Sequence, residues 1–230
     1  MPNTRFSLAA LREHIRKYLW LYIIGIGASL LLTNLLWTTT APRTPMDQMV
    51  QIYVASDYAS ADGMNGVAAE VLARTQPYDE TLLEVEFVSV NYTENDYYST
   101  MLLMTRLTTG DADAFICSQP VLDYLIGSGA TLPLDDYCAG GWLEGRDVEP
   151  IYATVQENEQ AEPSEILAAY RLGTVGPLAR LGALYDEDVY IAVMINGTNT
   201  DTTVKALENL VDILAEADAD AQTEAAEPAA

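Results

Sequence analysis

The chain has 230 residues, which suits one domain with an appendage or two very small domains. Its formal net charge is -23, although residues 1–17 hold four basic residues and one acid. The remaining residues therefore carry a charge of about -26, and such an acidic surface repels phosphate backbones, so we expect no nucleic-acid partner.

Residues 18–37, YLWLYIIGIGASLLLTNLLW, form an uncharged apolar segment near the N-terminus. As a helix, a segment of this length spans about 30 Å, the thickness of a bilayer's hydrocarbon core. Trp20 and Trp37 lie near its two ends, as interfacial aromatic anchors do. The basic cluster of residues 1–17 lies entirely on the N-terminal side of the segment, so the positive-inside rule places residues 1–17 in the cytoplasm and the C-terminal domain outside the cell membrane. The sequence thus predicts a single-pass membrane protein that contacts the lipid bilayer through residues 18–37.

Two other interpretations of this segment are a buried core helix and a cleaved signal peptide. A buried core helix is disfavoured because the chain offers no comparable apolar partner. A cleaved signal peptide is a closer rival, since Thr39–Ala41 loosely resembles a cleavage site. However, Pro42 follows directly and the apolar run is long for a signal peptide. We therefore favour an uncleaved anchor.

Residues 38–49 are rich in threonine and proline and are typical of a stiff stalk. Periodicity then predicts alternating strands and helices: strand 51–56, helix 64–75, strand 81–90, helix 97–109, strand 113–118 and helix 120–127. Gly110 can take the positive φ that ends a helix, and the buried strand after it is too short to alternate. Repeated strand–helix–strand units imply parallel strands joined by right-handed crossovers. We expect an α/β fold, a three-layer domain with a mainly parallel sheet covered on both faces.

The second half of the chain has weaker signals. Its expected elements are a short strand at 151–155, a mixed segment with a short helix at 166–184, a strand at 189–195 and an amphipathic helix at 202–216. Residues 217–230 are acidic and alanine-rich, which favours a disordered tail. The exported domain is accordingly placed at residues 50–216.

Three stretches resemble a known family. They are MLLMTRLTTGDADAFI, GATLPLDDY and YIAVMINGTNTDTTVKALENLVDIL. Their order is similar to that in the extracellular solute-binding proteins of bacterial ABC importers. The resemblance implies a periplasmic-binding-protein fold, of which about 190 exported residues would supply a single lobe. It also implies non-catalytic recognition of a solute. The alternative is a structural or assembly subunit that binds another membrane or envelope protein.

In an open α/β sheet, ligands bind outside the carboxyl ends of the strands. The residues expected there are Ser56, Asp57, Tyr58, Asn91, Tyr92, Ser118, Gln119 and Asn196. They would form a polar, aromatic-lined shelf suited to a sugar, a peptide or an amine. The alternative is that the serine, aspartate and asparagine side chains only cap the following helices.

Other side chains offer little chemistry. Cys117 and Cys138 lie in the exported domain, where a disulfide can form, although two buried free thiols remain the alternative. The only histidine, His14, falls on the opposite side of the membrane, so no zinc site is expected. The acidic run Asp186–Asp188 lacks the spacing of an EF-hand and is interpreted as a solvated loop. With no catalytic motif, we expect no enzyme activity, cofactor or metal.

Overall fold

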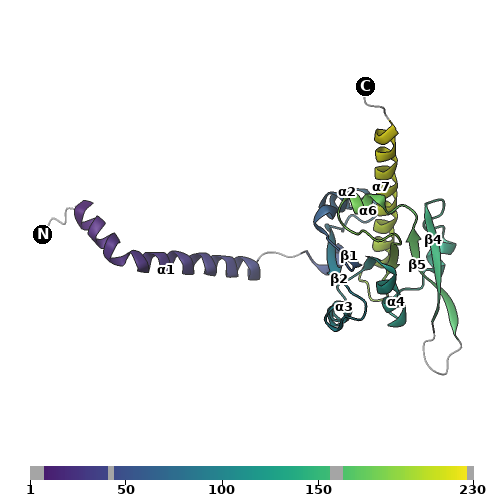
Figure 1. The fold of residues 1–230 in the computed structure, drawn as a ribbon, viewed down its shortest axis with the longest axis horizontal. Coiled ribbons are helices and arrows are strands. Elements are labelled where there is room, and N and C mark those ends of the chain that lie inside the picture. The colour runs from purple at the N-terminus through teal and green to yellow at the C-terminus, as the bar shows by residue number, and fades with distance from the viewer. Residues whose placement is uncertain (1–7, 41–43, 156–162, 227–230) are drawn as a thin grey trace. The chain divides into compact units, whose positions relative to one another are not determined.

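The structure is a computed structural model that describes residues 8–40, 44–155 and 163–226, in two compact units that meet between Arg43 and Thr44. The first unit contains α1 (Leu8–Thr40), drawn in purple in Figure 1. Within it, Arg12–Thr38 is long and apolar enough to cross a membrane, and none of this stretch is buried against other parts of the chain. The predicted apolar helix at 18–37 is therefore confirmed, and the helix extends beyond it at both ends.

The second unit is built on a six-stranded sheet with strand order β2-β1-β3-β6-β5-β4. The strands are β1 (Met49–Ser56), β2 (Glu84–Asn91), β3 (Ala114–Cys117), β4 (Val148–Val155), β5 (Ser164–Leu172) and β6 (Tyr190–Val193). The helices are α2 (Asn65–Thr75), α3 (Tyr97–Thr109), α4 (Gln119–Gly127), α5 (Asp135–Ala139), α6 (Gly176–Arg180) and α7 (Thr200–Ala226). Two short 3-10 turns are η1 (Met46–Gln48) and η2 (Asp62–Met64).

The α/β class is confirmed, but the sheet is mixed. Strand β1 pairs in parallel with β2 and β3, as the strand–helix–strand units predict. The other three pairings, β3 with β6, β6 with β5 and β5 with β4, are antiparallel. The expectation of a mainly parallel sheet therefore holds only for the β2-β1-β3 part. The direction changes first between β3 and β4, because β4 and β6 both run opposite to β3, and the β4–β5 hairpin and the β5–β6 connection each reverse the chain again.

Strand β5 was not recognised from the sequence, which was interpreted there as a mixed segment with a short helix. Its buried run includes Leu167, Ala168, Ala169 and Tyr170, so both sides of the strand are covered. A strand buried on both faces loses the alternation of apolar and polar residues, and a short apolar run is then as compatible with a helix as with a strand. The expected short helix is present later, as α6.

Helices cover both faces of the sheet, as predicted. Val50, Ile52 and Val54 of β1 point into a core that includes residues of α2, α6 and α7, while Tyr53 and Ala55 point into a second core beneath α3 and α4. In Figure 1, α2, α6 and α7 lie on one side of the sheet and α3 and α4 on the other. This alternation of neighbouring residues between two cores is the period of a strand buried on both sides.

Helix α7 includes the predicted helix at 202–216 but continues to Ala226. The predicted disordered tail is therefore wrong for residues 217–226, and residues 227–230 lie outside the described part of the chain. Alanine has the highest helix propensity, so an alanine-rich segment continues a helix that tertiary packing has already started. Arg180 of α6 contributes an ion pair to this extension, with its guanidinium 3.1 Å from Asp218.

The predicted stalk at 38–49 is divided between helix α1 and the folded body. Helix α1 includes its first residues and runs to Thr40, and residues 41–43 lie outside the described part. The remainder belongs to the folded body, because Thr44 hydrogen-bonds Glu84 of β2 and Gln48 closes a turn onto the Pro45 carbonyl at 2.9 Å. The body thus begins at Thr44 rather than at residue 50.

Candidate functional site

The carboxyl ends of β1, β2 and β3 lie at one edge of the sheet. Ser56 is in register with Asn91 across the β1–β2 pair, and Ala55 with Cys117 across the β1–β3 pair. The chain reaches β2 on one side of β1 and β3 on the other, so this edge is a topological switch point, where open α/β sheets bind ligands. We call the surface formed by Ser56, Asp57, Tyr58, Asn91, Ser118, Gln119, Tyr185 and Asp186 the switch-point rim.

Asn196 does not belong to this rim, contrary to the prediction. Strand β6 is antiparallel to β3, with Ala114 opposite Val193, so the residues after β6 lie at the other edge of the sheet. The residues before β6 take their place. The Ser56 hydroxyl donates a hydrogen bond of 2.6 Å to Oδ2 of Asp186, and the rings of Tyr58 and Tyr185 lie 5.6 Å apart.

Some of the predicted rim residues use their polar atoms to hold the fold. Ser56 is buried, and its hydroxyl binds Asp186 rather than facing solvent. The Oδ1 atom of Asn91 accepts a hydrogen bond of 2.9 Å from the N–H of Ala59 and so closes the loop after β1. Neither residue caps a helix as the alternative interpretation expected, because the N-cap residues of α2 and α3 are Met64 and Asp96.

The next three predicted residues differ in their roles. Tyr92 is buried, and its ring packs against Tyr124 of α4 at 6.1 Å, so it belongs to the core beneath α3 and α4. Ser118 is also buried, and its N–H donates to the Ala55 carbonyl at 3.0 Å. Gln119 is exposed, and its side chain donates to Asp123 one helical turn later at 2.7 Å. Of the three, Gln119 alone presents its side chain to solvent.

The exposed centre of the rim is the tyrosine pair. Tyr58 retains 59% of its surface and Tyr185 62%, although their rings contact each other. Acidic residues flank both tyrosines in the sequence, because Asp57 precedes Tyr58 and the run Asp186–Asp188 follows Tyr185. Asp188 pairs with Arg171 at 3.0 Å, whereas in the described part of the chain no ion pair neutralises Asp57, Asp186 or Glu187. Aromatic faces and unpaired carboxylates both attract organic cations.

The two cysteines do not form the disulfide that the sequence left open. Both are free: Cys117 is fully buried beneath α3 and α4, and Cys138 is exposed on α5. Cys138 lies beside Tyr170, a member of the core on the opposite face of the sheet, so the sheet separates the two thiols. Burial raises the pKa of Cys117, and the nearby Asp186 and Asp123 carboxylates raise it further. This thiol is protonated at neutral pH and is a poor nucleophile.

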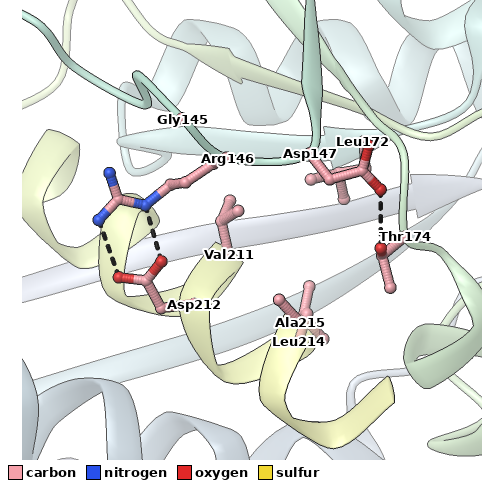
Figure 2. A pocket seen from close by; sticks show the side chains of 9 residues that line it. All are labelled: Gly145, Arg146, Asp147, Leu172, Thr174, Val211, Asp212, Leu214 and Ala215. Atoms are coloured by element: carbon pink, nitrogen blue, oxygen red, sulfur yellow. Dashed lines mark hydrogen bonds and ion pairs between the residues drawn. The ribbon is translucent and has the colours of Figure 1, made fainter. Parts of the chain in front are cut away.

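A cavity of about 220 Å³ lies between the segment Gly145–Asp147 and helix α7 (Figure 2). Arg146 lines the cavity and donates two hydrogen bonds, of 2.7 and 2.8 Å, to the carboxylate of Asp212. Asp147 accepts a hydrogen bond of 2.9 Å from the Thr174 hydroxyl. Leu172, Val211 and Leu214 supply apolar lining. Because its charged groups satisfy one another, this cavity is better explained as a gap between packed elements than as a ligand site.

A second cavity, of about 560 Å³, lies between the end of α4 and the β4–β5 hairpin. Its lining includes Gly127, Thr131 and Ile195, and Thr131 forms a β-bridge with Met194 just after β6. It is therefore at the edge of the sheet opposite the switch-point rim. In the described residues, no group of three or more histidine, cysteine, aspartate or glutamate side chains converges as a metal site requires.

Comparisons with known proteins assign no family: no family model and no curated protein matches this chain. The resemblance to solute-binding proteins therefore stays a prediction. Sequence reasoning missed Tyr185 and Asp186 because it assumed that β6 runs parallel to β3.

Proposed function

We propose that this chain is a membrane-anchored, non-catalytic recognition protein that binds a small polar solute carrying an ammonium group. The binding surface is the switch-point rim. The observation that carries the proposal is the exposed pair Tyr58 and Tyr185, set among unpaired carboxylates at the switch point of the sheet.

The anchor in this proposal is α1. Its apolar stretch has the length and composition of a membrane span, and no part of that stretch is buried within the chain. Four basic residues precede the apolar stretch, within residues 1–17. By the positive-inside rule these residues are cytoplasmic and the body is outside the cell membrane. The body holds no histidine, and its buried cysteine is protonated, which supports a role in binding rather than in catalysis.

An ammonium group is the favoured chemistry because two independent attractions coincide at the rim. A cation over a tyrosine face gains about 0.5–1 kcal/mol at an exposed site. The carboxylates of Asp57 and Asp186 add Coulomb attraction that no described cation cancels through an ion pair. Anionic solutes are repelled by the same charges, so phosphates and dicarboxylates are excluded from the proposed ligands.

The test uses the full chain in detergent micelles and follows its melting temperature with panels of amino acids, polyamines and neutral sugars. A ligand at one hundred times its Kd stabilises the folded state by about 2.7 kcal/mol, which a thermal shift detects. We expect an amine to raise the melting temperature and a Tyr58→Ala/Tyr185→Ala double variant to bind it at least tenfold more weakly. Tyr152→Ala, on β4, is the matched control because Tyr152 is comparably exposed but remote from the rim.

Two results would contradict the proposal. One is that no amine in the panel shifts the melting temperature of the full chain. The other is that the double variant and the Tyr152→Ala control bind the amine equally well. Binding of neutral sugars with equal strength in the presence and absence of 1 M salt would remove the ammonium group from the proposal, because screening weakens only the charged component.

A structural or assembly subunit that binds another membrane protein is the second candidate. The observation in its favour is that neither described cavity opens at the rim, whereas sites for small molecules bury most of the ligand surface. An open edge with exposed tyrosines also suits a protein partner. A membrane protein that co-purifies with the full chain, and is lost in the tyrosine double variant, would favour this candidate over the solute.

A further inference from the structure

Helix α3 presents a face that nothing in the described structure covers. Of its residues, Ser99 and Leu103 are buried. The opposite side shows four large side chains, with exposed fractions of 77% for Tyr97, 74% for Tyr98, 50% for Met101 and 59% for Met104. Spacings of three and four residues align Tyr97, Met101 and Met104 along one stripe of the helix.

The threonine hydroxyls beside this α3 face are already hydrogen-bonded within the helix. Thr105 and Thr108 lie on the same side, and their hydroxyls donate to the helix carbonyls of Met101 and Met104 at 2.8 and 2.7 Å. Hydroxyls that bond back to their own helix turn their methyl groups outward. Covering these two threonines therefore leaves none of their donors unpaired, which is the main cost of burying a polar group.

The charge of α3 limits which kind of partner can bind its exposed face. The helix contains no acid between Tyr97 and Thr109, on a body whose sequence is strongly acidic, and its one charged residue is Arg106, outside the stripe formed by Tyr97, Met101 and Met104. A basic partner would be drawn to the acidic surfaces instead of to this neutral one. A second copy, which the acidic surfaces repel, can approach most closely where the charge is absent. A lipid surface fits less well, because interfacial helices carry lysine or arginine beside tryptophan, phenylalanine or leucine.

We infer that the α3 face is the contact between two copies of this chain, packed antiparallel so that Met101 of each copy lies against Met104 of the other. This inference does not depend on solute binding at the switch-point rim. Such a contact is isologous and closes on itself, as twofold dimers require. Tyrosine and methionine are also enriched at protein interfaces.

The available area is sufficient when the copies share a membrane. Two tyrosines and two methionines at these exposures offer on the order of 500 Å² per copy, or about 1,000 Å² per pair, the lower limit of specific interfaces. Anchoring both copies in one bilayer raises their effective concentration and compensates for a small interface. Gly25 and Ser29 of α1 add a small-x-x-x-small pattern that lets two such helices approach closely.

The first experiment measures the mass of the full chain in detergent by light scattering. We expect a dimer, and we expect Met104→Arg to raise its dissociation constant at least tenfold, because the variant places two like charges at the centre of the contact. Met104 is exposed, so circular dichroism should show an unchanged fold. Leu83→Arg is the matched control, since Leu83 is similarly exposed but lies outside α3.

The second experiment locates the contact by cross-linking with a short bis-maleimide. The background variant is Cys138→Ser, which removes the exposed thiol and leaves the buried Cys117. In this background, Met101→Cys should cross-link much faster than Leu83→Cys. A monomeric wild-type chain overturns the inference. So does a dimer that survives Met104→Arg and cross-links equally at both positions, because α1 alone would then hold the copies together.

Discussion

Asp113 is a buried carboxylate that joins three segments of the body. It retains 5% of its surface. Its Oδ2 atom accepts a hydrogen bond of 2.8 Å from the N–H of Gln51 in β1, and its Oδ1 atom accepts one of 2.9 Å from Thr198. Thr198 and Asn199 lie just before α7, so the carboxylate also faces the positive end of that helix. We expect Asp113→Asn to destabilise the fold, although the two side chains have nearly the same shape.

The magnitude follows from the hydrogen-bond inventory. An asparagine offers one acceptor oxygen and one NH2 group, so either Gln51 or Thr198 would face a donor in place of an acceptor. A buried unsatisfied N–H costs about 1–3 kcal/mol. Burial raises the pKa of Asp113 against the opposing effect of the backbone donors, so the neutral variant regains part of the desolvation cost. We expect a net loss of about 2 kcal/mol, or about 4–8 °C in melting temperature for a body of this size.

The assay is differential scanning calorimetry of the full chain at pH 7. Asp111→Asn is the control, because this carboxylate lies two residues earlier and accepts no hydrogen bond from any described residue. The control should melt within 1–2 °C of the wild type, as substitutions away from such networks usually do. If Asp113→Asn melts together with the control, the carboxylate does not hold β1 and the start of α7 together.

Three further substitutions test the packing and electrostatics of the body by thermal or chemical unfolding. Thr203 is fully buried with an unpaired hydroxyl, so Thr203→Val should stabilise the fold by up to about 1 kcal/mol. Gly63→Ala should destabilise it by more than about 2 kcal/mol, because the new Cβ atom would lie 1.9 Å from the backbone oxygen of Leu181. Hydrogen bonds from Thr81 and Thr202 lower the pKa of Asp79 below 3.8, so its stabilising contribution is complete above that pH and is lost as the pH falls through the folded-state pKa. Asp79→Asn should therefore lose less stability than the wild type between pH 5 and pH 2.

Each of these expectations has an outcome that contradicts it. A less stable Thr203→Val variant would mean that the hydroxyl has a partner in solution. Gly66→Ala is the control for Gly63→Ala, because nothing lies within 4 Å of its new Cβ atom and alanine favours the interior of α2. Equal effects of the two alanines would remove the proposed clash. Parallel acid-unfolding curves for the wild type and Asp79→Asn would show that Asp79 binds its partners no better when ionised.

Local patterns in the first half of the chain predicted its fold closely. The strand at 51–56 and the helix at 97–109 correspond to β1 and α3, and Gly110 ends α3 at a φ of 68°. These elements are read well because each has its own periodicity and its own stop signal. In the second half, β5 is buried on both faces and has no alternation, and α7 extends through an alanine-rich segment that composition alone suggested to be disordered.

The predictions for the switch-point rim were also correct in part and wrong in part. Ser56 and Asn91 lie together as predicted because both end parallel strands, whereas Asn196 lies at the other end of the strands and Tyr185 and Asp186 were not predicted at the rim. A strand's residues give no information about its direction, since parallel and antiparallel strands have the same period of two. Direction depends on which neighbour the strand pairs with, and that is a property of the whole sheet.

The sequence by itself determined the apolar N-terminal helix, the α/β class and the parallel β2-β1-β3 centre, because each follows from local periodicity together with the rule for strand–helix–strand crossovers. Only the tertiary structure decided the direction of β6, the separation of the two cysteines by the sheet and the exposure of one side of α3. Those features depend on contacts between segments far apart in the chain. Periodicity shows that a face is apolar, but the packing of the whole domain decides whether that face is covered.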